Sequence, residues 1–150
     1  MKRRIFLLLL VVYLAGAAGA QEKGTWRAAS KTAESITGDL TFGDDRVTIN
    51  FASFPLAEIR SLTPAEAAAV FNADGGTPGL GHLYRVIIPA AKKFLHKNTL
   101  CGSEETEWMV TYVSNRTLQV GLFSGQKMPV MTPEALSNST SLCGTFSYVP

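Results

Sequence analysis

The fold is decided by residues 35–51, which read Ser-Ile-Thr-Gly-Asp-Leu-Thr-Phe-Gly-Asp-Asp-Arg-Val-Thr-Ile-Asn-Phe. Apolar and polar residues alternate along 46–51, and 35–42 has a similar pattern, so both segments are predicted to be half-buried strands. Gly43, Asp44 and Asp45 between them favour a turn. We therefore expect an antiparallel hairpin whose inner face carries Ile36, Leu40, Phe42, Val47, Ile49 and Phe51.

Short apolar runs separated by turn residues continue on both sides of this hairpin. They predict further strands at residues 24–29, 56–60, 83–88, 107–113, 117–123 and 144–149. Ser114, Asn115 and Arg116 predict the turn of a second hairpin. A mainly β chain with about eight antiparallel strands favours a closed up-and-down barrel, and a two-sheet β-sandwich is the alternative.

One short helix is expected to interrupt the strands. Thr63 offers a capping hydroxyl, Pro64 suits the first helical position, and Glu66 completes a capping box ahead of an alanine-rich run. The glycine-rich residues 72–81 end this helix and predict a loop. Residues 89–97 fit either a short helix or an irregular strand.

The N-terminal segment differs from the rest of the chain. Basic residues at positions 2–4 precede an apolar run at 5–14 and a small-residue stretch that ends in Ala-Gly-Ala. This order predicts a signal peptide over residues 1–20, cleaved near Ala20. The apolar run is shorter than the ~20 residues that span a bilayer, which disfavours integration into a membrane. We expect one β-rich domain over residues 21–150, periplasmic or secreted and not integral to a membrane.

The charge of this predicted mature domain differs from that of the whole sequence. The 150 residues carry 14 basic and 12 acidic side chains, a net charge of +2. Without Lys2, Arg3 and Arg4, 11 basic residues remain against 12 acidic ones, a net charge of −1. Nucleic acids and anionic membranes both require a concentrated basic surface, so this balance disfavours both as main partners.

The two cysteines, Cys101 and Cys143, both lie in the predicted mature domain. In an oxidising compartment an even pair is most simply one disulfide. A redox-active or metal-binding pair is the alternative, but the sequence has no Cys-x-x-Cys motif. We therefore expect a structural disulfide between them.

Gly24 and Trp26, at the head of the first predicted strand, form a Gly-x-Trp triplet. In this motif and in its strand number the chain resembles the lipocalin-like (calycin) barrels, which open with the same triplet. The resemblance implies an eight-stranded barrel with Trp26 plugging one end. The chain departs from that family in its helix, which lies mid-chain instead of near the C-terminal end.

Residues 83–148 are similar to a group of uncharacterised bacterial exported proteins. The similarity is carried by Leu-Tyr-Arg at 83–85, Asn-Thr-Leu-Cys-Gly at 98–102, residues 120–125, and Leu-Cys-Gly-Thr-Phe-Ser-Tyr at 142–148. It implies export and brings no activity with it.

The sequence offers little material for catalysis. It has only two histidines, His82 and His96, and no Gly-x-Ser-x-Gly elbow, so no Ser/His/Asp triad is indicated. The two histidines have no metal-site spacing, and the glycine-rich loop lacks the Lys-Ser/Thr ending of a phosphate loop. Glu104, Glu105 and Glu107 fit a solvated loop edge. We expect no enzyme, no catalytic residue, no metal and no cofactor.

A binding role is therefore favoured. Small barrels either fill their interior with side chains or leave room for one ligand. Our leading hypothesis is an exported, non-enzymatic β-barrel that binds a small apolar or amphipathic ligand in its interior, with Trp26, Tyr84, Trp108 and Tyr112 as candidate ligand-binding residues. The aromatic residues available to fill or line the interior are Trp26, Phe42, Phe51, Tyr84, Trp108, Tyr112, Phe123, Phe146 and Tyr148.

The competing hypothesis is an inhibitor or interaction partner of an exported enzyme that acts through its loops. Residues 75–81 and 126–141 are long enough to project from a barrel. The second loop contains the apolar residues Met128, Pro129, Val130 and Met131.

Overall fold

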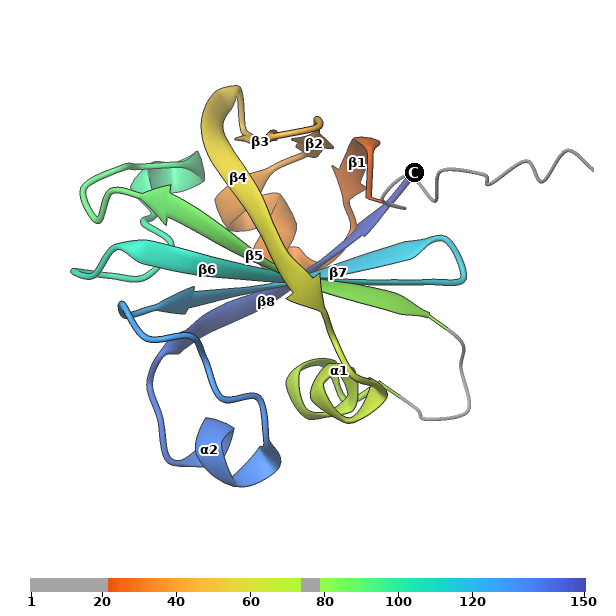
Figure 1. Ribbon diagram of the computed structural model, residues 1–150. Helices are drawn as coiled ribbons and strands as arrows, with labels where there is room; N and C mark the ends of the chain where they lie inside the picture. Colours follow the sequence, from red (N-terminus) through yellow and green to blue (C-terminus); the bar gives the residue numbers. More distant parts are fainter. Residues whose placement is uncertain (1–21, 74–78) are drawn as a thin grey trace, which may run out of the picture.

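A computed structural model of the chain describes residues 22–73 and 79–150. Its eight strands form a closed antiparallel barrel in the order β1 to β8, with β8 pairing back to β1 (Figure 1). The mainly β, up-and-down barrel expected from the sequence is confirmed, and the sandwich alternative is not formed. The predicted signal peptide, residues 1–20, lies outside the described residues.

The strands are three to ten residues long, and within the described residues four helical segments lie in their connections. The strands are β1 (Gly24–Ala28), β2 (Leu40–Phe42), β3 (Arg46–Ile49), β4 (Ala52–Ser61), β5 (Leu80–Ile88), β6 (Thr106–Ser114), β7 (Thr117–Ser124) and β8 (Leu142–Val149). The helical segments are the π-helical turn η1 (Ala33–Thr37), α1 (Pro64–Phe71), the 3₁₀ turn η2 (Leu95–Lys97) and α2 (Pro133–Ser137).

Successive strands of this barrel run in opposite directions, which sorts the connections between its two ends. The connections after β1, β3, β5 and β7 gather at one end, which we call the loop end. The start of β1, the end of β8 and the remaining connections lie at the other end, the N-terminal end. The disulfide between Cys101 and Cys143 (Cα–Cα 5.1 Å) is confirmed and ties the β5–β6 connection to the first residues of β8.

The predicted hairpin at 35–51 is present but shorter than expected. Strands β2 and β3 pair through Leu40 with Ile49 and Phe42 with Val47, around the turn at 43–45. The prediction of a strand from residue 35 is wrong, because residues 33–37 form η1. Gly38 ends that turn with a positive φ of 62°, which glycine adopts without strain.

The prediction that Phe51 faces the core is also wrong. Ile49 pairs with Ala52, so Asn50 and Phe51 alone make the β3–β4 turn. Both have positive φ angles, 44° and 69°, as a two-residue turn of this kind requires. The side chain of Phe51 is 97% exposed. Alternation alone placed Phe51 inside, but the closure of the turn takes it out of the strand.

Other strand and turn boundaries in the structure also differ from the predicted ones. Strand β4 begins at Ala52 and runs through Pro55, four residues earlier than predicted. In the second hairpin Ser114 still pairs with Thr117, so Asn115 and Arg116 alone form the turn. Residues 89–97, left open between helix and strand, are irregular apart from η2.

Helix α1 forms as its capping signal predicts. The hydroxyl of Thr63 accepts the backbone N–H of Glu66, and the carboxylate of Glu66 accepts the N–H of Thr63. Helix α2 was not predicted, although it starts with the same Thr-Pro pair. The hydroxyl of Thr132 accepts the N–H of Ala135, and Pro133 occupies the first helical position.

Alternation along the strands divides the buried apolar residues into two clusters. The inner cluster fills the barrel and draws residues from all eight strands; the outer cluster joins the outside of β5 to β7 to α1. Helix α1 can approach β7 because residue 121 is glycine: a Cβ there would lie 2.9 Å from Val110 and 3.2 Å from Val70. Within the described ranges, no helix combines the length and hydrophobicity needed to cross a membrane.

Candidate functional site

The four residues predicted to bind a ligand do not form one site. Trp26 and Tyr84 belong to the inner cluster, whereas Trp108 and Tyr112 belong to the outer one. The guanidinium carbon of Arg85 lies 4.5 Å from the centre of the Trp108 ring. Tyr112 stacks on Phe71 of α1. The barrel wall therefore separates the two pairs, and the outer pair packs the surface of the sheet.

The middle of the barrel is tightly packed. The inward-facing side chains along β2, β3 and β5 to β8 are almost completely buried. Their exposed fractions are Leu40 1%, Val47 0%, Ile49 1%, Val86 1%, Met109 0%, Leu118 0%, Val120 1%, Leu122 1% and Tyr148 0%. Aromatic residues thus fill the interior together with aliphatic ones.

A polar cluster lies inside the barrel towards its N-terminal end. The carboxylate of Glu22 is buried, with 1% of the residue exposed. Its Oε1 atom accepts hydrogen bonds from Nδ1 of His82 and Oγ1 of Thr111, each at 2.6 Å. The backbone carbonyl of Glu22 accepts the indole N–H of Trp26 at 2.7 Å. The residues just before β1 are thus fixed to β1, β5 and β6.

Two further groups complete the surroundings of His82. Its Nε2 lies 3.6 Å from Oε1 of Glu58, a half-exposed residue of β4. The ring of Tyr84 lies 6.0 Å from the imidazole ring. Burial, followed by the negative charges of Glu22 and Glu58, raises the pKa of Tyr84 well above its ordinary value, so this phenol stays neutral.

One atom of this cluster is left unsatisfied. Oε2 of Glu22 is buried and has no hydrogen-bond partner among the described residues. A buried carboxylate oxygen without a donor is costly, and the neighbouring hydroxyl of Tyr84, which interacts with the Glu22 side chain, is the group placed to reduce that cost. Sequence reasoning missed Glu22 because it precedes the first strand and has no periodicity or motif to mark it.

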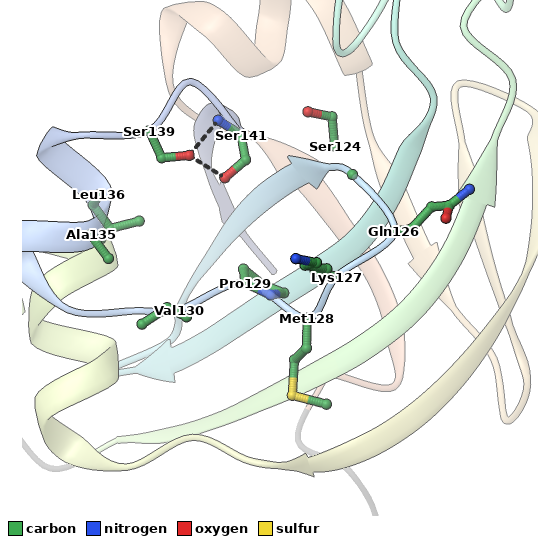
Figure 2. Close-up of a pocket in the computed structure, with 11 residues that line it drawn as sticks. Ser124, Gln126, Lys127, Met128, Pro129, Val130, Ala135, Leu136, Ser139 and Ser141 are labelled. Atoms are coloured by element: carbon green, nitrogen blue, oxygen red, sulfur yellow. Dashed lines mark hydrogen bonds between the residues drawn. The ribbon is translucent and has the colours of Figure 1, made fainter.

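The loop end carries a groove, shown in Figure 2, within the β7–β8 connection, between its first residues and α2. Its volume is about 470 Å³, within the range of small binding sites. Figure 2 shows Ala135 and Leu136 of α2 on one side and the loop from Lys127 to Val130 on the other. Ser139 and Ser141, joined by a hydrogen bond of 2.9 Å, border the groove with polar groups.

The apolar segment 128–131 divides between this groove and the outer cluster. Met128 is 43% exposed and Val130 65% exposed, whereas Met131 is buried at 3%. At the base of the loop, the indole N–H of Trp108 donates to the carbonyl of Gly125 at 2.9 Å. The loop is therefore anchored at both ends and projects two apolar side chains between the anchors.

The remaining candidates lie apart from both features. The ring of His96 contacts the carbonyl of Ser35 at the loop end, and Glu107 pairs with Arg85 on the outer wall. In the part of the chain that the structure describes, no group of three or more His, Cys, Asp or Glu side chains could hold a metal ion. No protein-family model, no curated protein and no solved structure matches this chain.

Proposed function

We propose that the protein is an exported, non-enzymatic binding module that engages an apolar segment of a protein partner through the groove at its loop end. One observation carries this proposal. Met128 and Val130 stand exposed on a loop whose two ends are fixed, beside an open groove rimmed by serines. Protein interfaces have this composition, with apolar side chains at the centre and a polar rim.

The anchoring of the loop supports a role in binding. The Trp108–Gly125 hydrogen bond, the burial of Met131 and the Thr132 cap of α2 hold the loop before any partner arrives. A preorganised loop loses less conformational entropy on binding, so more of the contact energy appears as affinity. Export is supported by the disulfide and by the predicted signal peptide.

Site-specific photo-crosslinking in the organism that makes the protein tests this function. A photoreactive amino acid at position 130 should give one dominant protein adduct. The same probe at position 116, in the exposed β6–β7 turn at the N-terminal end, is the matched control and should not give it. Met128→Asp in the same chain should reduce the adduct at least tenfold, because a charge would be buried at the contact. Equal labelling at positions 116 and 130 would count against the proposal.

The second candidate is a small apolar or amphipathic ligand inside the barrel. The carboxylate oxygen Oε2 of Glu22 favours it, because this buried acceptor has no hydrogen-bond partner of good geometry among the described residues, and a ligand could supply one. The packed middle of the barrel means that such a ligand would have to displace side chains. Native mass spectrometry of protein purified from its own host, with a dye-displacement assay, tests this; no bound mass and no displacement would reject it.

A further inference from the structure

The side chain of Glu22 is held by hydrogen bonds from two strands to which its own backbone does not belong, as a bound ligand would be. The residue lies outside the barrel sheet, yet its carboxylate sits inside the barrel against two donors from neighbouring strands, His82 of β5 and Thr111 of β6. These two residues face each other in the β5–β6 register, so the sheet fixes their spacing without help from Glu22. The donor pair is part of the barrel, and the acceptor is brought to it by the residues that directly precede β1.

We propose that His82 and Thr111 form a carboxylate-binding site inside the barrel and that the side chain of Glu22 occupies it as a tethered ligand. A free carboxylic acid anion is the class of ligand that the site accepts when this side chain is absent. An imidazole N–H and a hydroxyl are the donors that recognise a carboxylate oxygen, and burial strengthens both bonds. The hydroxyl of Tyr84 also lies close enough to interact with the carboxylate of Glu22, so the site offers three polar side chains around one carboxylate.

The position of Trp26 connects this site to closure of the barrel. Its indole N–H donates to the carbonyl of Glu22, and its ring packs in the inner cluster at 7% exposure. An acid that entered from the N-terminal end would therefore have to displace Glu22 and disturb Trp26 together. The side chain of Glu22 thus blocks access to the carboxylate site. This inference is independent of the partner-binding role proposed for the loop end.

Chemical rescue with small carboxylates tests the proposal. Glu22→Ala in the full chain vacates the site and should lower Tm. Formate, and then acetate, should raise Tm again in a saturable way, because a ligand that binds only the folded state stabilises it by linkage. Sodium chloride at the same ionic strength should not. If Glu22→Ala is unfolded without ligand, recovery of the circular dichroism spectrum in formate is the same result, and no recovery overturns the proposal.

Matched variants separate binding at this site from a general salt effect. Glu22→Gln keeps the site filled with an amide and should gain no more from formate than the unmodified protein does. Adding Thr111→Val to Glu22→Ala removes one donor and should weaken the response to formate at least fivefold. Glu66→Ala breaks an ion pair outside the barrel and should not be rescued. Equal formate effects in all four variants would overturn the proposal.

The two histidines provide a readout that does not depend on stability. In an NMR titration of folded Glu22→Ala with formate, the imidazole signals of His82 should shift and saturate. Those of His96, an exposed residue at the loop end, should stay constant and serve as the internal control. Parallel shifts of both rings, or none in either, would overturn the site.

Discussion

At the scale of single residues, the least expected position is Phe51. A bulky side chain with a φ of 69° is strained, since the left-handed region costs a non-glycine residue roughly 1–2 kcal/mol. No burial offsets this cost, because the ring is 97% exposed. We therefore expect Phe51→Gly to raise the free energy of unfolding by about 1 kcal/mol, measured by urea denaturation.

Phe51→Ala is the control for this substitution. It removes the ring but keeps the backbone strain, so the free energy of unfolding should change little. Arg116 occupies the equivalent position of the β6–β7 turn, also at φ 69°, and Arg116→Gly should give a similar gain. A loss of stability in Phe51→Gly would mean that the ring makes contacts that stabilise the fold.

At the scale of elements, the N-terminus of α1 combines a cap with an ion pair. The guanidinium of Arg60 donates to both oxygens of Glu66 at 2.7 and 2.8 Å. This contact, with the Thr63 backbone bond, lowers the pKa of Glu66 from its ordinary 4.5 to about 2. Because the folded-state pKa is depressed, the stabilisation is fully present above pH 4.5 and is lost as the pH falls towards 2.

Glu66→Gln should therefore lower the free energy of unfolding at pH 7 by about 1 kcal/mol. The expected loss is smaller than the full pKa shift of Glu66 would give, because the Arg60 side chain is 39% exposed and solvent screens the ion pair. The difference between variant and unmodified protein should shrink between pH 4.5 and 2, as followed by denaturation at several pH values. Asp44→Asn, at the exposed Lys23 pair, is the control and should change stability less. A pH-independent loss in Glu66→Gln would point to the cap geometry instead of the charge.

At the scale of the whole molecule, the disulfide links the β5–β6 connection to β8 over a sequence separation of 42 residues. Closing a loop of this length restricts the unfolded chain and is worth roughly 4 kcal/mol in the chain-entropy model. In the double variant Cys101→Ser and Cys143→Ser, the free energy of unfolding should fall by a large part of that amount, as measured by urea denaturation. The partner-binding loop should still form, because its anchors at Trp108 and Met131 do not depend on the cysteines.

Reduction of the unmodified protein is the matching control. Under reducing conditions it should unfold at the same urea concentration as the double variant. A loss below about 1 kcal/mol in both would show that the reduced chain retains structure that offsets the missing crosslink.

Much of the fold could be predicted because local patterns were strong. The hairpin of β2 and β3, the capped helix α1 and the second hairpin all have turn or capping residues that act within a few positions. The errors fell where local signals conflicted with pairing. Phe51 continued an alternating pattern, but pairing of Ile49 with Ala52 placed it in the turn.

The candidate sites were less predictable for a different reason. The apolar segment 128–131 was visible in the sequence, but its division into exposed Met128 and Val130 and buried Met131 depends on α2 and the outer cluster. Glu22 gave no signal at all, since its partners His82 and Thr111 are 60 and 89 residues away along the chain.

The sequence by itself determined about eight antiparallel strands, the helix α1 and the pairing of the only two cysteines, because these follow from periodicity, short-range turns and composition. Only the tertiary structure decided that the sheet closes, and closure decided the rest. It placed Trp26 and Tyr84 inside the wall and Trp108 and Tyr112 outside it. It also brought Glu22 against two distant strands. Contacts between remote residues are set by where the sheet closes, and no local pattern encodes that position.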